Sequence, residues 1–187
     1  GSRNYEHAKA MMFAEPQAWH KLMEHLTGVI INYLNAQIDV GVQVVQLFDS
    51  WVGALGPSDY REFVLPHQKN VIAGIKKTVP LIHFAHGATH LLEMVAEAGG
   101  DVIGLDWRCN LDEAWKRVGY DKAVQGNIDP ISLFGSKEFI RKRTKDILDR
   151  AGGRNGHIMN LGHGILQQTP LENAAEFINA THEMSKR

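Results

Sequence analysis

Cysteine is nearly absent from this sequence, which has one, Cys109, among 187 residues. A single cysteine excludes a disulfide within the chain and a metal site built from several thiolates, and it fits a reducing compartment. An excess of one charge is also lacking, since 20 Lys and Arg residues stand against 21 Asp and Glu residues. The chain therefore lacks the basic footprint with which proteins bind nucleic acids or anionic membranes. No apolar run approaches the roughly 18 residues of a membrane span.

Several familiar catalytic motifs are missing as well. The sequence has no Gly-x-x-x-x-Gly-Lys phosphate loop, no Gly-x-Gly-x-x-Gly after a predicted strand, and no Gly-x-Ser-x-Gly nucleophile turn. Of its ten histidines, His83, His86 and His90 are spaced by three and four residues. That spacing would suit metal ligands on a helix, but His83 and His86 lie at the end of a predicted strand. The spacing therefore carries no prediction of a metal site.

What the sequence does contain is a regular alternation of helices and strands. A strong helix is predicted over residues 16–39, where apolar residues recur every three or four positions after Pro16. Five strands, each followed by a helix, come next. The predicted strands are 42–48, 80–85, 101–105, 122–126 and 157–161. The predicted helices are 57–78 (kinked or split by Pro66), 89–98, 111–118, 136–151 with Ser136 as N-cap, and a last helix to about Ser185, opened by the capping box Thr169-Pro170-Leu171-Glu172.

This alternation predicts an α/β fold with a parallel sheet. Two architectures fit: an open doubly wound sheet, or a (β/α)8 TIM barrel, which takes about 250 residues. Five βα units cannot close an eight-stranded barrel, so a barrel of this type would lack three units at its front. Gly1-Ser2 is interpreted as a cloning scar, which divides the chain into a tail, 1–3, and a barrel portion, 4–187.

Polar clusters follow the predicted strands, where α/β proteins gather their functional groups. Asp49 and Asp106 are interpreted equally well as functional groups or as acceptors of backbone N–H groups in turns. Asn127 and Asp129, before Pro130, are predicted to be turn residues rather than catalysts.

Two tryptophans and one histidine complete the set of candidates. Trp51 and Trp107 are either core residues or flat apolar walls for a ligand. His163 is the stronger functional candidate, because it lies between Gly162 and Gly164 at a strand's C-terminal end. The flanking glycines are expected to give the loop backbone freedom and to let a ligand approach closely.

Four of these segments, taken in order, resemble one family. The stretches QLFDSWVGALGPSDYREFVLP, VIGLDW, VQGNIDP and NLGHGI closely resemble uroporphyrinogen decarboxylases. The resemblance implies a cytoplasmic homodimer built on a (β/α)8 barrel, whose fourth to eighth strands are those predicted above. It also implies removal of carboxylate from the four acetate side chains of uroporphyrinogen III, giving coproporphyrinogen III in haem biosynthesis, without a metal or organic cofactor.

The resemblance also implies roles for individual residues. His163 matches the family's histidine after the eighth strand and is the predicted catalytic residue. Ser50 matches a serine that contacts the tetrapyrrole substrate, and Phe48 matches an apolar residue of the cleft. Arg108 is a candidate contact for a substrate carboxylate, on its position alone.

Three features of the family have no counterpart in this chain: the arginine-rich motif after the first strand, the pyrrole-binding aspartate after the second, and the tyrosine after the third. We therefore expect the chain alone to be inactive. One alternative is a non-catalytic truncated barrel that acts as a binding or assembly module. A less favoured one is a corrinoid-linked methyltransferase, whose His-x-Cys zinc motif is replaced in this sequence by His83-Phe84-Ala85, with Cys109 on a different loop.

Overall fold

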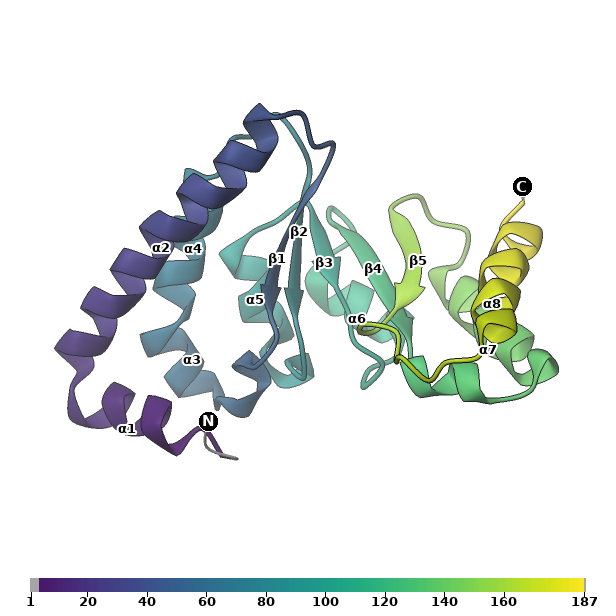
Figure 1. The fold of residues 1–187 in the computed structure, drawn as a ribbon, viewed down its shortest axis with the longest axis horizontal. Helices are drawn as coiled ribbons and strands as arrows, with labels where there is room; N and C mark the ends of the chain where they lie inside the picture. The colour runs from purple at the N-terminus through teal and green to yellow at the C-terminus, as the bar shows by residue number, and fades with distance from the viewer. Residues whose placement is uncertain (1–3, 187) are drawn as a thin grey trace. The chain divides into compact units, whose positions relative to one another are not determined.

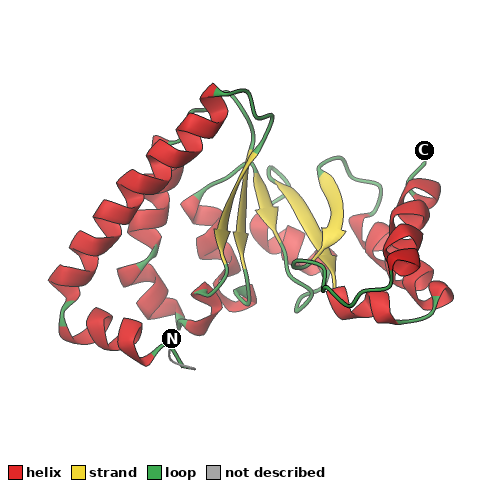
Figure 2. Cartoon of the chain, viewed as in Figure 1, coloured by secondary structure: helices red, strands yellow, loops and turns green. Residues whose placement is uncertain are grey.

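A computed structural model describes residues 4–186, in which helices and strands alternate along the chain (Figure 1). The predicted tail at residues 1–3 lies outside the described residues. The chain divides into two compact units, Gly1–Asp101 and Val102–Arg187. Within each unit the strands pair in parallel (Figure 2), which confirms the predicted α/β class. In the described part of the chain, no helix is both long enough and apolar enough to cross a membrane.

The first unit contains two parallel strands, with helices before, between and after them in the chain. Strand β1 pairs with β2 in a register that sets Val45 beside Leu81 and Asp49 beside Ala85. The predicted helix over 16–39 is confirmed at both ends, whereas α1 was not predicted. The elements are α1 (Glu6–Ala14), α2 (Pro16–Asp39), β1 (Val45–Asp49), η1 (Val52–Ala54), α3 (Pro57–Phe63), α4 (Leu65–Gly74), β2 (Leu81–Ala85), η2 (Thr89–Leu91) and α5 (Leu92–Ala98).

Helices α2 and α4 lie side by side in this unit (Figure 1). Asn35 joins them, because its Nδ2 donates to Gly74 O at 3.0 Å and its Oδ1 accepts from Lys76 N at 2.8 Å. Nearer the start of α2, His20 Nδ1 lies 2.9 Å from Nε2 of the buried His67. The predicted split of residues 57–78 is confirmed, with Val64 between α3 and α4.

One face of α2 remains exposed and apolar. Its residues are spaced by four, three and four positions, which places them along one side of the helix. We call them the α2 stripe: Leu22, Leu26, Val29 and Tyr33.

The second unit is a three-stranded parallel sheet with β4 in the middle, paired to β3 and β5. Its core is formed by side chains that are almost completely buried, among them Ile103, Trp115, Val124, Ile128 and Ile140. The elements are β3 (Val102–Gly104), α6 (Leu111–Val118), β4 (Ala123–Ile128), η3 (Pro130–Phe134), α7 (Lys137–Ala151), β5 (His157–Leu161) and α8 (Leu171–Met184).

The helix ends of the second unit test two sequence predictions. Ser136 is the N-cap of α7, since its side chain accepts from Phe139 N at 3.2 Å. The predicted capping box of the last helix is wrong: Pro170 occupies the N-cap, and the buried Oγ1 of Thr169 has no hydrogen-bond partner among the described residues. The start of α8 is held instead by Asn173, whose Nδ2 donates to Leu133 O at 2.7 Å.

Candidate functional site

The end of β1 carries two of the predicted site residues. Phe48 is 64% exposed and makes an edge-to-face contact with Phe84 of β2, with ring centroids 5.9 Å apart. Ser50 is half-buried and is the first residue after the strand. The loop that begins there runs to Leu55, and we call residues 50–55 the Ser50 loop.

Between Phe48 and Ser50, the carboxylate of the half-buried Asp49 ends a chain of hydrogen bonds that begins at the buried Tyr60. Tyr60 Oη donates to Gln68 Oε1, and Gln68 Nε2 donates to Asp49 Oδ2. Asp49 thus accepts a side-chain hydrogen bond from α4, and both sequence interpretations of this residue stay predictions.

Burial controls the ionisation of this chain. It raises the pKa of Asp49 to about 6, against the opposing effect of the hydrogen bonds from Gln68 and the backbone. Burial also raises the pKa of Tyr60, and the negative charge of Asp49 adds to that effect. Tyr60 therefore stays protonated as a donor.

The backbone carbonyls of the Ser50 loop are held from other elements. Lys9 Nζ of α1 donates to Ala54 O at 2.8 Å. His86 Nδ1 lies 3.3 Å from Ser50 O, and His90 Nε2 lies 2.8 Å from Leu55 O. The loop is therefore tied to segments that both precede and follow it in the chain.

Gly53 brings this loop against the turn after β2. A Cβ on Gly53 would lie 2.5 Å from the carbonyl carbon and oxygen of Gly87. Only glycine permits so close an approach of two backbone segments.

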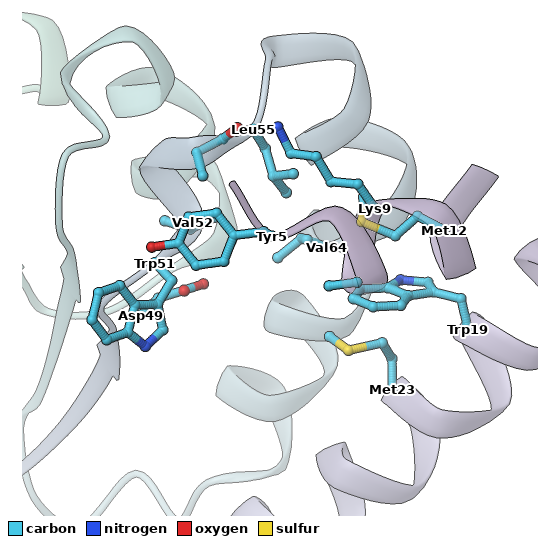
Figure 3. Close-up of a pocket in the computed structure, with 12 residues that line it drawn as sticks. Tyr5, Lys9, Met12, Trp19, Met23, Asp49, Trp51, Val52, Leu55 and Val64 are labelled. Atoms are coloured by element: carbon cyan, nitrogen blue, oxygen red, sulfur yellow. Dashed lines mark hydrogen bonds between the residues drawn. The ribbon is translucent and has the colours of Figure 1, made fainter. Parts of the chain in front are cut away.

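A cavity of about 200 Å³ opens beside the loop. Its walls are largely apolar, and Tyr5 and Trp51 contact each other at its edge, with ring centroids 6.1 Å apart. Trp51 is 69% exposed and lines the cavity, so it is not a core residue, and its role as a wall for a ligand stays a prediction. Figure 3 shows the side chains that line the cavity, with Asp49 and Trp51 on one side and Met12, Trp19 and Met23 on the other.

In the second unit, Arg108 is bound to the turn that follows β3. Its Nη1 lies 3.0 Å from Asp106 Oδ2, and its guanidinium carbon lies 4.3 Å from the centre of the Trp107 ring. Asp106 Oδ1 also accepts Arg108 N at 2.9 Å, which confirms the turn interpretation of Asp106. The carboxylate of Asp106 is buried, whereas the Arg108 side chain is 45% exposed.

The residues after β4 have structural contacts. Asp129 accepts Ile131 N at 2.9 Å and caps η3, as predicted for a turn residue. Asn127 requires a correction, because β4 extends to Ile128 and Asn127 lies within the strand instead of a turn. Its Nδ2 donates to Asp106 O at 2.9 Å and to Cys109 O at 2.8 Å, and so fixes the turn that carries Arg108.

His163 is exposed in a bend directly after β5. Neither Gly162 nor Gly164 is among the glycines with left-handed backbone, and the predicted close approach of a ligand stays a prediction. A Cβ on Gly162 would lie 2.7 Å from Trp107 N, whereas Gly164 has no atom within 4 Å of such a Cβ. Glycine at 162 thus permits the backbone before His163 to lie against the Asp106–Trp107 turn.

Each unit therefore carries two predicted site residues. Phe48 and Ser50 lie two positions apart at the end of β1, and Arg108 and His163 lie on segments that approach each other at Gly162. Among residues 4–186, no three His, Cys, Asp or Glu side chains are placed to hold a metal ion. Sequence reasoning missed Lys9, which holds the Ser50 loop, and the pair of Tyr60 and Gln68, which is hydrogen-bonded to Asp49. None of them carries a local signal, since lysine and glutamine on helices are ordinarily surface residues.

Comparison with known proteins gives one consistent result. The family profile described as "Uroporphyrinogen decarboxylase (URO-D)" matches residues 1–184. Curated relatives named uroporphyrinogen decarboxylase include those of Carboxydothermus hydrogenoformans, Roseiflexus sp. and Streptomyces coelicolor. They are 55%, 50% and 46% identical over 99%, 98% and 100% of this chain, and over 53%, 55% and 53% of their own lengths. The chain thus spans about half the length of the curated relatives it matches.

A solved structure of a methyltransferase from Methanosarcina mazei is also similar. It matches with a TM-score of 0.75 and 21% identity over 86% of this chain and 48% of its own. At that identity the likeness concerns the fold alone, and it supports the predicted (β/α)8 barrel type, of which residues 4–186 form five strands.

Proposed function

Because the chain belongs to the uroporphyrinogen decarboxylase family, we propose that it supplies the C-terminal βα units of an enzyme that converts uroporphyrinogen III to coproporphyrinogen III. The observation that carries this proposal is the family match over residues 1–184, together with relatives of that name at 46–55% identity. Since the chain spans about half of those relatives, the complete activity is assigned to a full-length barrel and not to this stretch alone.

The proposed reaction replaces a carboxylate on each of four acetate side chains by hydrogen. The pyrrole ring first accepts a proton at carbon and becomes a cationic electron sink. The bond to the carboxylate then breaks, its electron pair enters the ring system and CO₂ leaves. A proton is added to the remaining CH₂ group, and loss of the ring proton restores the pyrrole. The site must therefore supply an acid, stabilise positive charge on the ring and hold the other carboxylates.

We assign roles in this reaction to four residues. His163 hydrogen-bonds a substrate carboxylate or relays the proton, since the two ring nitrogens of an exposed imidazole can donate and accept. Ser50 donates a hydrogen bond to an acetate or propionate group, and the exposed Phe48 ring forms part of the apolar wall. Arg108 supports a further carboxylate through its planar guanidinium, while its contacts with Asp106 and Trp107 hold it in place.

The proposal extends to the assembly and its setting. We propose a cytoplasmic homodimer that needs no metal or organic cofactor, as the resemblance implies. The exposed α2 stripe is consistent with further packing of this chain against other protein surfaces. Sedimentation of the full-length barrel tests the dimer, and cell fractionation tests the compartment.

A chimaera tests the activity directly. This chain replaces the matching 53% of the Carboxydothermus hydrogenoformans relative, and the product is measured as coproporphyrin by fluorescence after oxidation. We expect the chimaera to decarboxylate uroporphyrinogen and this chain alone to be inactive. A folded chimaera that releases no coproporphyrinogen would refute the assignment.

The two alternatives make different predictions for the same samples. A binding or assembly module would leave the chimaera inactive while this chain still captured a protein partner. A corrinoid-linked methyltransferase would contain zinc, which elemental analysis would detect. The described residues offer no cluster of ligands in favour of the latter.

A further inference from the structure

We propose that the cavity beside the Ser50 loop is a binding site for a small, neutral aromatic molecule, one ring in size, that carries a hydroxyl or N–H donor. The ring lies between the apolar walls of the cavity, and the donor faces the carboxylate of Asp49. The proposal rests on the contacts of the first unit alone and does not depend on the proposed decarboxylase activity.

The volume of the cavity sets the size of the ligand. The cavity measures about 200 Å³, and an apolar cavity of about 150 Å³ in another protein holds one molecule of benzene. A single ring with a small substituent therefore fits. A tetrapyrrole does not fit, because pockets for much smaller, drug-sized molecules already measure roughly 300 Å³ or more.

The walls of the cavity favour an aromatic ring. Tyr5 and Trp51 contact each other at its edge, with ring centroids 6.1 Å apart. Trp19 lies on the other side, together with the thioether side chains of Met12 and Met23 (Figure 3). Aromatic rings pack favourably against one another, and a methionine sulfur makes favourable contacts with a ring. An aromatic ligand thus meets suitable partners on both sides.

One polar group of the lining can receive a donor from the ligand. The Lys9 ammonium and the Trp19 indole N–H donate to backbone carbonyls, at 2.8 and 2.9 Å. Asp49 differs, because Gln68 Nε2 donates to its Oδ2, and no side chain of residues 4–186 donates to its Oδ1. Each carboxylate oxygen can accept, so Oδ1 is the acceptor for the hydroxyl or N–H group of the ligand.

The charges at the cavity favour a neutral ligand. An anion would face the carboxylate of Asp49, and a cation would face the ammonium of Lys9, since both residues line the cavity. Partial burial raises the pKa of Asp49 to about 6, so this carboxylate is mostly ionised at pH 7 and acts as an acceptor. A hydrogen bond from a neutral donor to an ionised acceptor is among the stronger ones in proteins.

The first test compares two probes of nearly equal shape, phenol and toluene, by calorimetric titration of this chain at pH 7. Phenol has the hydroxyl donor that toluene lacks, so it should bind about tenfold more tightly, the effect of one hydrogen bond to a charged group. Equal affinities would overturn the role of Asp49. If phenol does not bind at all, the site itself is overturned.

Asp49→Asn tests the acceptor without changing the shape of the cavity. Because Gln68 Nε2 requires an acceptor, the new carbonyl should face Gln68 and the new NH₂ group should face the cavity. The preference for phenol over toluene should then fall at least about threefold, while the affinity for toluene stays unchanged. A preserved preference for phenol would contradict the contact with Asp49.

A second pair of variants tests the cavity and leaves Asp49 in place. Ala8 and Ala10 are both exposed residues of α1, but only Ala8 lines the cavity. Ala8→Leu should weaken the binding of both probes at least about tenfold, because the larger side chain takes up space that the ring needs. Ala10→Leu is the matched control and should bind them as the unaltered chain does. Equal affinities in the two variants would overturn the location of the site.

The same titration of the chimaera distinguishes a ligand site from a socket for another part of the barrel. Both probes should bind the chimaera as they bind this chain. Binding that is lost in the chimaera would overturn the proposal, because a side chain from the rest of the barrel would then fill the cavity. Neither probe reports on decarboxylation, so a failure of the proposed function leaves the outcome of these titrations unchanged.

Discussion

Replacing Gly162 by alanine should destabilise the second unit, although the residue is neither catalytic nor left-handed in its backbone. The new Cβ would lie 2.7 Å from Trp107 N and 3.0 Å from both the Cα and the carbonyl carbon of Asp106. Ordinary contacts begin at 3.4 Å, so the two backbones must separate by about 0.7 Å, which is 3.4 minus 2.7. Neither backbone can move freely, because Asn127 Nδ2 donates to Asp106 O at 2.9 Å and Gly162 N donates to Ile128 O at 2.7 Å.

The magnitude follows from two opposing effects. Forcing an extra carbon into a packed site costs about 1–3 kcal/mol of the free energy of unfolding. The lower entropy of the unfolded alanine chain offsets about 0.4–1 kcal/mol of that cost. Gly164→Ala is the matched control, since nothing lies within 4 Å of its Cβ, and it should be neutral or slightly stabilising. Because both variants gain the same entropic benefit, they should differ by about 1–3 kcal/mol, the steric cost alone.

Urea denaturation followed by tryptophan fluorescence measures this difference. For a protein of this size, a loss of 1 kcal/mol lowers Tm by about 2–4 °C, so a thermal scan is an independent check. If Gly162→Ala and Gly164→Ala unfold at the same urea concentration, the close approach of the β5 loop to the Asp106–Trp107 turn is not a feature of the folded protein. Steric exclusion of a side chain would then fail as the reason for glycine at 162.

Two further predictions concern the first unit. Burial and the adjacent His20 lower the pKa of His67 from its ordinary value of 6.5, so the unfolded chain takes up the proton first and the free energy of unfolding should fall as the pH drops below about 6.5. Urea denaturation at a series of pH values should show a weaker pH dependence of this free energy in His67→Gln. The same pH dependence in His67→Gln and in the exposed control His25→Gln would contradict the prediction. The α2 stripe should cause self-association of the chain. Leu26→Glu replaces exposed apolar surface by charge and should raise the dissociation constant of the self-associated chain at least about tenfold in sedimentation equilibrium. An equal increase in the control Lys21→Glu would assign the effect to charge alone.

Much of the fold could be predicted from the sequence, because it rests on local signals. The helix over 16–39 begins at a proline and carries a regular apolar period, and both of its ends are confirmed. Ser136 was recognised as an N-cap for the same reason. The capping box at Thr169 has an equally local signal and is wrong, because Pro170 takes the cap position and α8 is fixed by Asn173 to a segment about forty residues earlier.

The organisation of the candidate site could be predicted only in part. The position of Ser50 after a strand follows from the alternation of elements. The contacts of Lys9 and Gln68 with the Ser50 loop and with Asp49 do not, since they join residues 45 and 19 positions apart. Gly162 shows the same limit: the sequence indicates that glycine matters there, but the close approach that requires it involves a turn more than fifty residues earlier.

The attachments of the Ser50 loop have a consequence for how the protein moves. The loop is tied to α1 through Lys9, to α4 through Asp49 and Gln68, and to the segment after β2 through His86 and His90. Releasing any one of these leaves the others in place, so the loop can open only when several elements of the first unit open together. Its fluctuations should then belong to the slow, cooperative unfolding of that unit. We do not expect a segment of this kind to close over a ligand as a lid does. A ligand that binds beside it would have to adapt to a rigid wall.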